Sequence, residues 1–140
     1  MIVLDTNVVS ALMRRDTDPV VVEWLDDQPP ESIWTTAVTV FEVCFGLEIL
    51  ADGRRRQQLE DEFARALVED FEGRILPFEQ NAARAAARIA GRRRQAGRPI
   101  EIRDAQIAGI AAARRATLAT RNTRHFADLG IALVDPWADR

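Results

Sequence analysis

Four oxygen-bearing side chains could act together although they are scattered along the chain: Asp5, Glu42, Asp104 and Asn122. The three carboxylates would repel one another if they met, because like charges raise one another's pKa. A group of this kind is normally held together by a cation. Hard oxygen ligands favour Mg²⁺, with Mn²⁺ as a possible substitute, over softer metals. The residue types therefore predict that Asp5, Glu42 and Asp104 hold a divalent cation.

Two of these acidic residues also have a purely structural interpretation. Asp5 suits the N-cap of a helix, where a carboxylate accepts a hydrogen bond from a backbone N–H of the first turn. Asp104 suits a first helical turn, where the helix dipole favours negative charge. Glu42 differs from both, because it lies between Phe41 and Val43 in an apolar run where a solvated carboxylate is out of place. The structural alternative thus stays open for Asp5 and Asp104.

The segments that must position these residues alternate between strand and helix patterns. Short apolar runs rich in β-branched residues predict strands at 1–4, 32–36, 75–78, 117–120 and 131–134. The segments between these strands show the periodicity of helices. One predicted helix has an apolar side formed by Val38, Phe41, Phe45 and Leu47, and another starts at Asp104. This order predicts an α/β fold, with helices on both faces of a central, mostly parallel sheet of about five strands.

A parallel sheet gives the scattered side chains a common meeting place. Ligands of such sheets bind beyond the carboxyl ends of the strands. Asp5, Glu42 and Asn122 each follow a predicted strand, and Asp104 opens a helix that precedes one. We therefore expect all four side chains to converge at one edge of the sheet.

Composition limits the class of protein. A chain of 140 residues with 47% hydrophobic residues suits a single domain over 1–140. A lone Cys44 excludes an internal disulfide, no segment is apolar enough to span a membrane, and no secretory signal is recognisable, so we expect a cytoplasmic protein. The net charge is −3, yet all 19 basic residues are arginine, which suits bidentate contact with phosphate and permits a nucleic-acid partner.

Four motifs, in this order, resemble one known family. They are Asp5-Thr6-Asn7 behind an apolar strand, Thr39-Val40-Phe41-Glu42, the run 104–108 that begins Asp104-Ala105-Gln106, and the run 119–126 that contains Thr120-Arg121-Asn122. Together they resemble the PIN-domain toxins of VapBC-type toxin–antitoxin modules, most closely a FitB-like subgroup. The resemblance extends from Met1 to about Trp137. It implies a three-layer α/β/α sandwich and a metal-dependent endoribonuclease.

The resemblance also implies roles for individual residues. Asp5, Glu42 and Asp104 correspond to the acidic metal-site residues of the family, and Asn122 occupies a more variable fourth place that is Asp in many relatives. Because an amide carries no charge, Asn122 would orient water or phosphate, and catalysis would use a single Mg²⁺. His125 is either a phosphate contact or a residue that packs beside Phe126. No residue is expected to bind an organic cofactor.

The family further implies an RNA substrate, a cognate antitoxin, a homodimer, and contact with DNA only through the antitoxin. An apparent surplus of apolar residues on two helices also predicts contact with another chain: Val8, Val9, Leu12, Met13, Val21, Val22 and Trp24. The arginine runs 54–56 and 92–94 are predicted as solvated helix faces, with contact to RNA or antitoxin as the alternative. A non-catalytic PIN-fold module that binds RNA or protein is the competing functional hypothesis.

Overall fold

A computed structural model describes residues 1–14 and 16–138. Five parallel strands form one sheet in the order β3-β2-β1-β4-β5. The strands are β1 (Ile2–Leu4), β2 (Ile33–Thr36), β3 (Ile75–Leu76), β4 (Thr117–Ala119) and β5 (Ala132–Val134). The α-helices are α1 (Thr6–Leu12), α2 (Pro19–Asp26), α3 (Ala37–Glu48), α4 (Arg54–Arg65), α5 (Gln80–Gln95) and α6 (Ile102–Arg114). Shorter helical segments are η1 (Pro30–Ser32), η2 (Ala66–Asp70) and η3 (Thr123–Phe126). The predicted α/β fold is confirmed.

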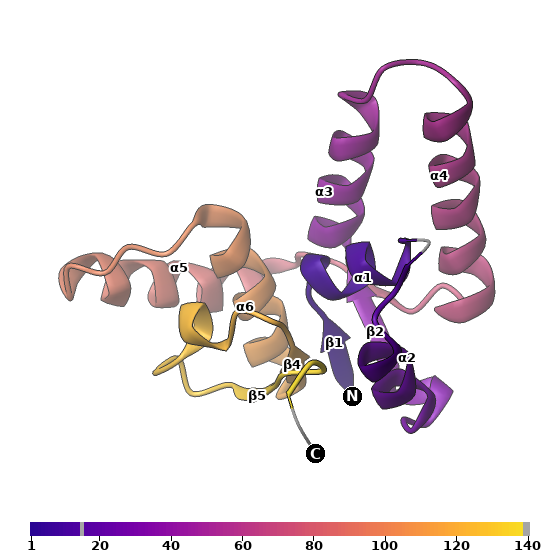
Figure 1. The fold of residues 1–140 in the computed structure, drawn as a ribbon. Coiled ribbons are helices and arrows are strands. Elements are labelled where there is room, and N and C mark those ends of the chain that lie inside the picture. Colours follow the sequence, from indigo (N-terminus) through magenta and orange to yellow (C-terminus); the bar gives the residue numbers. More distant parts are fainter. Residues whose placement is uncertain (15, 139–140) are drawn as a thin grey trace.

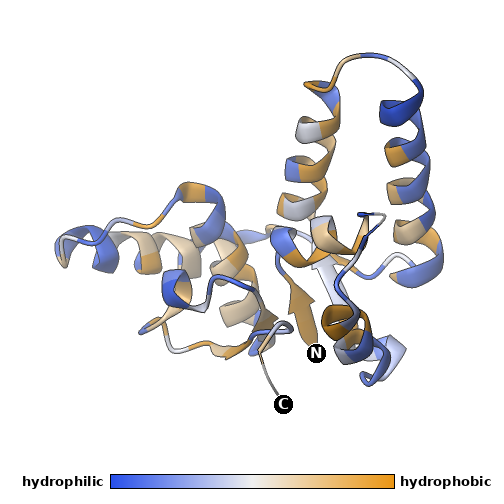
Figure 2. Ribbon diagram, in the orientation of Figure 1, coloured by the Kyte–Doolittle hydropathy of each residue, from blue (hydrophilic) through white to orange (hydrophobic). Residues whose placement is uncertain are grey.

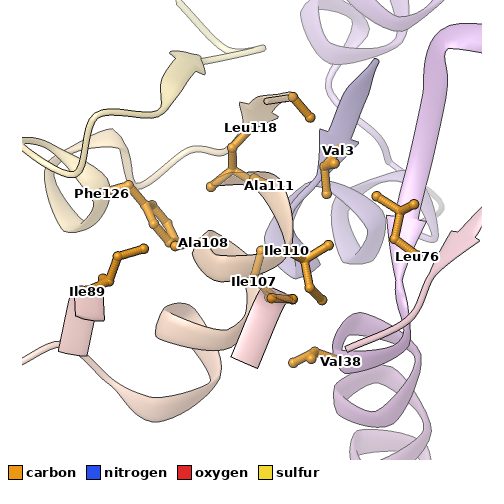
Figure 3. Close-up of a cluster of buried hydrophobic side chains, with 12 residues drawn as sticks. Val3, Val38, Leu76, Ile89, Ile107, Ala108, Ile110, Ala111, Leu118 and Phe126 are labelled. Carbon is orange, nitrogen blue, oxygen red and sulfur yellow. The ribbon is translucent and has the colours of Figure 1, made fainter. Parts of the chain in front are cut away.

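Helices α5 and α6 lie on one side of β1, and α3 and α4 lie on the other (Figure 1). Two apolar clusters pack against the sheet, and alternate residues of the strands enter different clusters. Leu4 and Ala119 belong to the cluster built with α1 to α4, whereas Val3 and Leu118 belong to the cluster built mainly with α5 and α6. Figure 3 shows the second cluster, with Leu118 close to side chains of α6. Because both faces are covered, the central strand β1 is apolar throughout, as its uniform colour in Figure 2 shows.

Helix α3 is oriented differently from the prediction. Its buried residues are Val38, Thr39, Val43 and Leu47. Positions 39, 43 and 47 recur every four residues and therefore form the packed side of the helix. Phe41 and Phe45 lie on the other side, with 58% and 50% of their surface exposed. The prediction that all four apolar residues share one side was thus right for Val38 and Leu47 and wrong for the two phenylalanines.

Part of the predicted surplus of apolar residues on α1 and α2 is buried within the chain. Val8, Val9, Val21 and Trp24 are all buried among residues of the same molecule. Val22 retains 38% exposure and is the exception among the valines of the predicted surplus. Four of the seven residues therefore need no other chain to cover them, whereas Leu12 and Met13 are only half-buried, and contact of these helices with another chain stays a prediction.

Helices α5 and α6 approach each other unusually closely. A Cβ atom added at Gly109 would lie 2.5 Å from the carbonyl oxygen of Ala82 and 2.7 Å from the Cβ of Ala86. Only glycine permits this contact, because a side chain at position 109 would overlap backbone atoms. The close packing fixes α6, whose first turn carries Asp104.

No helix within the described ranges is long and apolar enough to cross a membrane.

Candidate functional site

Asp5 occupies the junction between the central strand β1 and helix α1. It is the N-cap residue, and its extended backbone (φ −67°, ψ 160°) allows one carboxylate oxygen to accept a hydrogen bond from the backbone N–H of Thr6 at 2.8 Å. The other oxygen accepts a hydrogen bond from the Thr120 hydroxyl at 2.8 Å. Burial raises the pKa of Asp5, while these two hydrogen bonds and His125 oppose the rise. Asp5 is therefore an N-cap that is also held from β4.

Glu42 lies in the second turn of α3 and faces α1. The Thr6 hydroxyl donates to its Oε1 at 2.8 Å, and its Oε2 lies 3.9 Å from Nε of Arg103. Only 20% of the Glu42 side chain is exposed. Thr6 therefore connects two of the predicted acidic residues, because its backbone N–H holds Asp5 and its hydroxyl holds Glu42.

Behind Glu42 stands a row of threonine hydroxyls, from Thr36, Thr39 and Thr6. The Thr36 hydroxyl accepts from the backbone N–H of Thr39 at 3.0 Å and donates to the Thr39 hydroxyl at 3.3 Å. The Thr39 and Thr6 hydroxyls are 3.0 Å apart. Since a hydroxyl has one proton and Thr6 gives its own to Glu42, Thr39 must donate to Thr6. All three protons then point toward the carboxylate, so the row of hydroxyls ends as a donor to Glu42.

Asp104 lies in the first turn of α6, although it does not begin that helix. Glu101 is the N-cap residue, and its carboxylate accepts from the backbone N–H groups of Arg103 and Asp104. The pKa of Asp104 is raised from 3.8 to about 6, first by burial and then by the negative charges of Asp5, Glu101 and Glu42, against the opposing charge of His125. Asp104 therefore lies in the combined electric field of the other two predicted acidic residues.

Asn122 and His125 lie in the segment after β4. The backbone N–H of Asn122 donates to the Thr120 hydroxyl at 3.1 Å, whereas its exposed side-chain amide makes no hydrogen bond within the described ranges. Nδ1 of His125 is 3.8 Å from Oδ2 of Asp104, and 61% of the His125 side chain is exposed. Phe126 alone enters the core. The packing interpretation of His125 is therefore not supported, and the imidazole lies beside the acidic group.

One arginine side chain, that of Arg103, borders the acidic group, and that of Arg121 lies against Trp137. Arg103 lies near Glu42 and is bonded to Glu101 at 3.3 Å, a placement that the sequence analysis missed because it depends on the N-cap at Glu101. The Arg121 guanidinium lies 4.8 Å from the centre of the Trp137 ring, so part of its surface is engaged there.

The acidic group offers the kind of ligand atoms that a hard divalent cation prefers. Asp5, Glu42 and Asp104 offer only oxygen ligands, and the raised pKa of Asp104 reflects repulsion and burial that a cation would relieve. In the present arrangement, no three His, Cys, Asp or Glu side chains of residues 1–14 and 16–138 stand close enough to share one ion. An ion held by all three carboxylates would need them to stand closer together than they do here.

Comparison with known proteins identifies the family. The PIN-domain family model matches residues 2–132. The chain is 36% identical over 98% of its length to VapC ribonuclease Y4jK of Sinorhizobium fredii, of which it covers 98%. It is 35% identical over 99% of its length to Toxin FitB of Neisseria gonorrhoeae, of which it covers 100%. The solved structure of FitAB bound to an IR36 DNA fragment matches all of this chain and 98% of that one, with a TM-score of 0.91 and 34% identity. The chain therefore belongs to the PIN-domain family.

Proposed function

We propose that this chain is a Mg²⁺-dependent endoribonuclease and the toxin of a type II toxin–antitoxin pair, acting in the cytoplasm as a single PIN domain over residues 1–140. The observation that carries the proposal is that three acidic residues from different parts of the chain lie close enough to interact. The negative charges of Asp5 and Glu42 both help to raise the pKa of Asp104. The names of two relatives, a VapC ribonuclease and Toxin FitB, agree with it.

Asp5 and Asp104 would hold the ion directly, and Glu42 would complete the site. When bound, Mg²⁺ supplies charge for the phosphodiester oxygens and lowers the pKa of water, and Mn²⁺ would substitute for it. The protein's own contribution is orientation. Thr120 and the backbone of Thr6 fix the two oxygens of Asp5.

Glu42 is suited to orient the attacking water. Its Oε1 is held by the Thr6 hydroxyl, so Oε2 remains for water or for Arg103. Asn122 offers an uncharged amide beside this group, suited to contact water or phosphate. Arg103 and His125, which lie close to Glu42 and Asp104, would hold the RNA by its phosphates. Hydrolysis would leave a 5′-phosphate and a 3′-hydroxyl.

The decisive experiment measures cleavage of a fluorogenic RNA with Mg²⁺ and with EDTA. We expect activity only with the metal, and we expect Asp104→Asn to lose at least about 100-fold in kcat/KM because a direct ligand is removed. Asp70→Asn is the matched control, since Asp70 is exposed and its carboxylate makes no ion pair within the described ranges. RNA binding without cleavage under any metal condition would favour the non-catalytic module instead.

The proposed partners are a cognate antitoxin, through which the pair would contact DNA, and a second copy of this chain. The exposed side of α3 offers a surface for the homodimer. Phe41 and Phe45 stack with ring centres 6.0 Å apart, and Ile49 is 71% exposed one turn later. Exposed aromatic residues of this kind are typical of interfaces.

Light scattering of the purified chain tests the homodimer at micromolar concentration. We expect Phe45→Glu to shift a dimer toward monomer, because it places a charge in an apolar contact. Val68→Glu on η2 is a control, since Val68 is exposed at 71%, more than Phe45, and lies on a different segment. A wild-type protein that is monomeric would contradict the homodimer.

A further inference from the structure

Helix α5 carries an unbalanced positive charge. Between Gln80 and Gln95 it contains five arginines and no acidic residue. The whole chain has a formal net charge of −3, so the residues outside this helix carry −8. Four of the five arginines are exposed, and we call them the arginine face: Arg84, Arg88, Arg92 and Arg94.

The arginine face is not neutralised by the rest of the chain. Within residues 1–14 and 16–138 none of its members forms an ion pair, whereas Arg56 on α4 is paired with Glu48, Asp52 and Glu60. Three members recur at intervals of four residues, a spacing at which like charges destabilise a helix by about 0.2–0.5 kcal/mol per pair. Ion pairs within the described residues therefore do not account for the row, and its guanidinium groups are free to meet an external anion.

The other exposed residues of α5 argue against a protein segment as the partner of the arginine face. They are Gln80, Asn81, Ala87, Gly91 and Gln95. None has a large apolar side chain, although protein interfaces are anchored by buried aromatic or aliphatic groups. A regular row of guanidinium groups without apolar anchors instead matches a regular row of phosphates, which arginine binds in bidentate fashion.

The same helix is tied to the candidate site. Arg93 is only 8% exposed, and its Nη2 donates to the carbonyl oxygens of His125 at 2.8 Å and Ala127 at 3.0 Å. His125 in turn lies 3.8 Å from Asp104. A cleft of about 380 Å³ next to this contact is lined by Arg92, Arg93 and Arg98 together with residues 128–130. The arginine face thus begins beside the loop that borders the acidic group.

We propose that the arginine face of α5 binds the phosphodiester backbone of the RNA outside the position of cleavage. This inference rests on the proposed function, because it assigns the substrate of the acidic site to a second surface. Arg84, Arg88 and Arg92 lie roughly 6 Å apart along the helix axis. Each would contact one phosphate, and the contacts would be independent of base sequence.

The test measures binding of a fluorescent single-stranded RNA of about 12 nucleotides in EDTA over a series of salt concentrations. Replacing Arg84, Arg88 and Arg92 together by Gln should weaken binding about tenfold or more at low salt and should reduce the slope of log affinity against log salt by about 2, since each single-strand phosphate contact contributes roughly 0.7. Glutamine is a good helix former, so circular dichroism should show unchanged helix content.

The matched control replaces Arg54, Arg55 and Arg65 by Gln, because these residues are also exposed, lie on α4 and change the net charge equally. The control should bind as the wild type does. Equal losses in both triple variants, an unchanged slope in the α5 variant, or equally strong competition by polyglutamate would overturn the inference. Arginine-dependent RNA binding by a wild-type chain that cleaves no RNA with Mg²⁺ would support the surface and contradict the proposed function.

Discussion

Asp104→Asn should make the metal-free protein more stable while removing its activity. Asn has nearly the same shape as Asp but never ionises, so it keeps the packing at the start of α6 and removes a charge from the field of Asp5 and Glu42. The variant therefore measures how much the charge of Asp104 lowers folding stability, separately from the contribution of its packing. An ordinary structural carboxylate would give the opposite result, because its loss would remove a stabilising contact.

The magnitude follows from the raised pKa. One pKa unit corresponds to about 1.4 kcal/mol, so the rise from 3.8 to about 6 corresponds to roughly 3 kcal/mol against the charged, folded form. The side chain is 27% exposed, and screening by solvent reduces the expected effect to about 1.5 kcal/mol. Below pH 3.8 the carboxyl is protonated in both the folded and the unfolded chain. As the pH rises toward 6, the unfolded chain loses this proton first, and folding stability falls until the folded form has ionised too.

Urea denaturation in EDTA at about pH 7.5 and about pH 4 measures folding stability with Asp104 ionised and with most of it protonated in the folded chain. At the higher pH the variant should gain about 1.5 kcal/mol, or about 3–6 °C in Tm. At the lower pH the gain should shrink to a few tenths of a kcal/mol. Asp70→Asn should stay within about 0.5 kcal/mol of the wild type at both pH values. A loss of stability at pH 7.5, or a gain that does not depend on pH, would refute the reasoning.

Three further results are expected. Thr6→Val should lower kcat/KM about tenfold in single-turnover cleavage because Glu42 loses its hydroxyl donor, and Thr6→Ser should restore activity. Asn122→Asp should tighten Mn²⁺ binding in calorimetric titration by adding a charged oxygen, and an unchanged affinity would place Asn122 away from the ion. Gly109→Ala should destabilise the fold by about 1–3 kcal/mol in thermal melts through overlap with α5, whereas the unobstructed Gly91→Ala should stabilise it by about 0.5–1 kcal/mol.

The strands and the acidic residues could be predicted from sequence for a local reason. A strand buried on both faces leaves a continuous apolar run, and Asp5 stands immediately after such a run. The start of α6 was placed two residues late because Glu101 is a less common N-cap than Asp104 would be. The local apolar pattern likewise could not show which side of α3 packs against the rest of the chain. Phe41 and Val43 are both apolar, yet only Val43 is buried.

Which carboxylate each supporting hydroxyl contacts could not be predicted, because these contacts join distant parts of the chain. Thr6 and Glu42 are 36 residues apart, and Asp5 and Thr120 are 115 residues apart. A threonine carries no local signal that its hydroxyl will serve a carboxylate rather than its own backbone. The position of Arg103 beside Glu42 depends in the same way on the docking of α6 against α3.

The bond between Asp5 and Thr120 also has a consequence for biosynthesis. The ribosome makes β1 first and reaches Thr120 only 115 residues later, which takes roughly 6 to 23 s at about 5–20 residues per second. Until β4 pairs with β1, Asp5 lacks its hydroxyl donor and Asp104 has no fixed place beside it. A nascent chain therefore carries no assembled acidic group while most of it is being translated. The ribosome that makes the chain is exposed to the completed site only after β4 and Thr120 have been made.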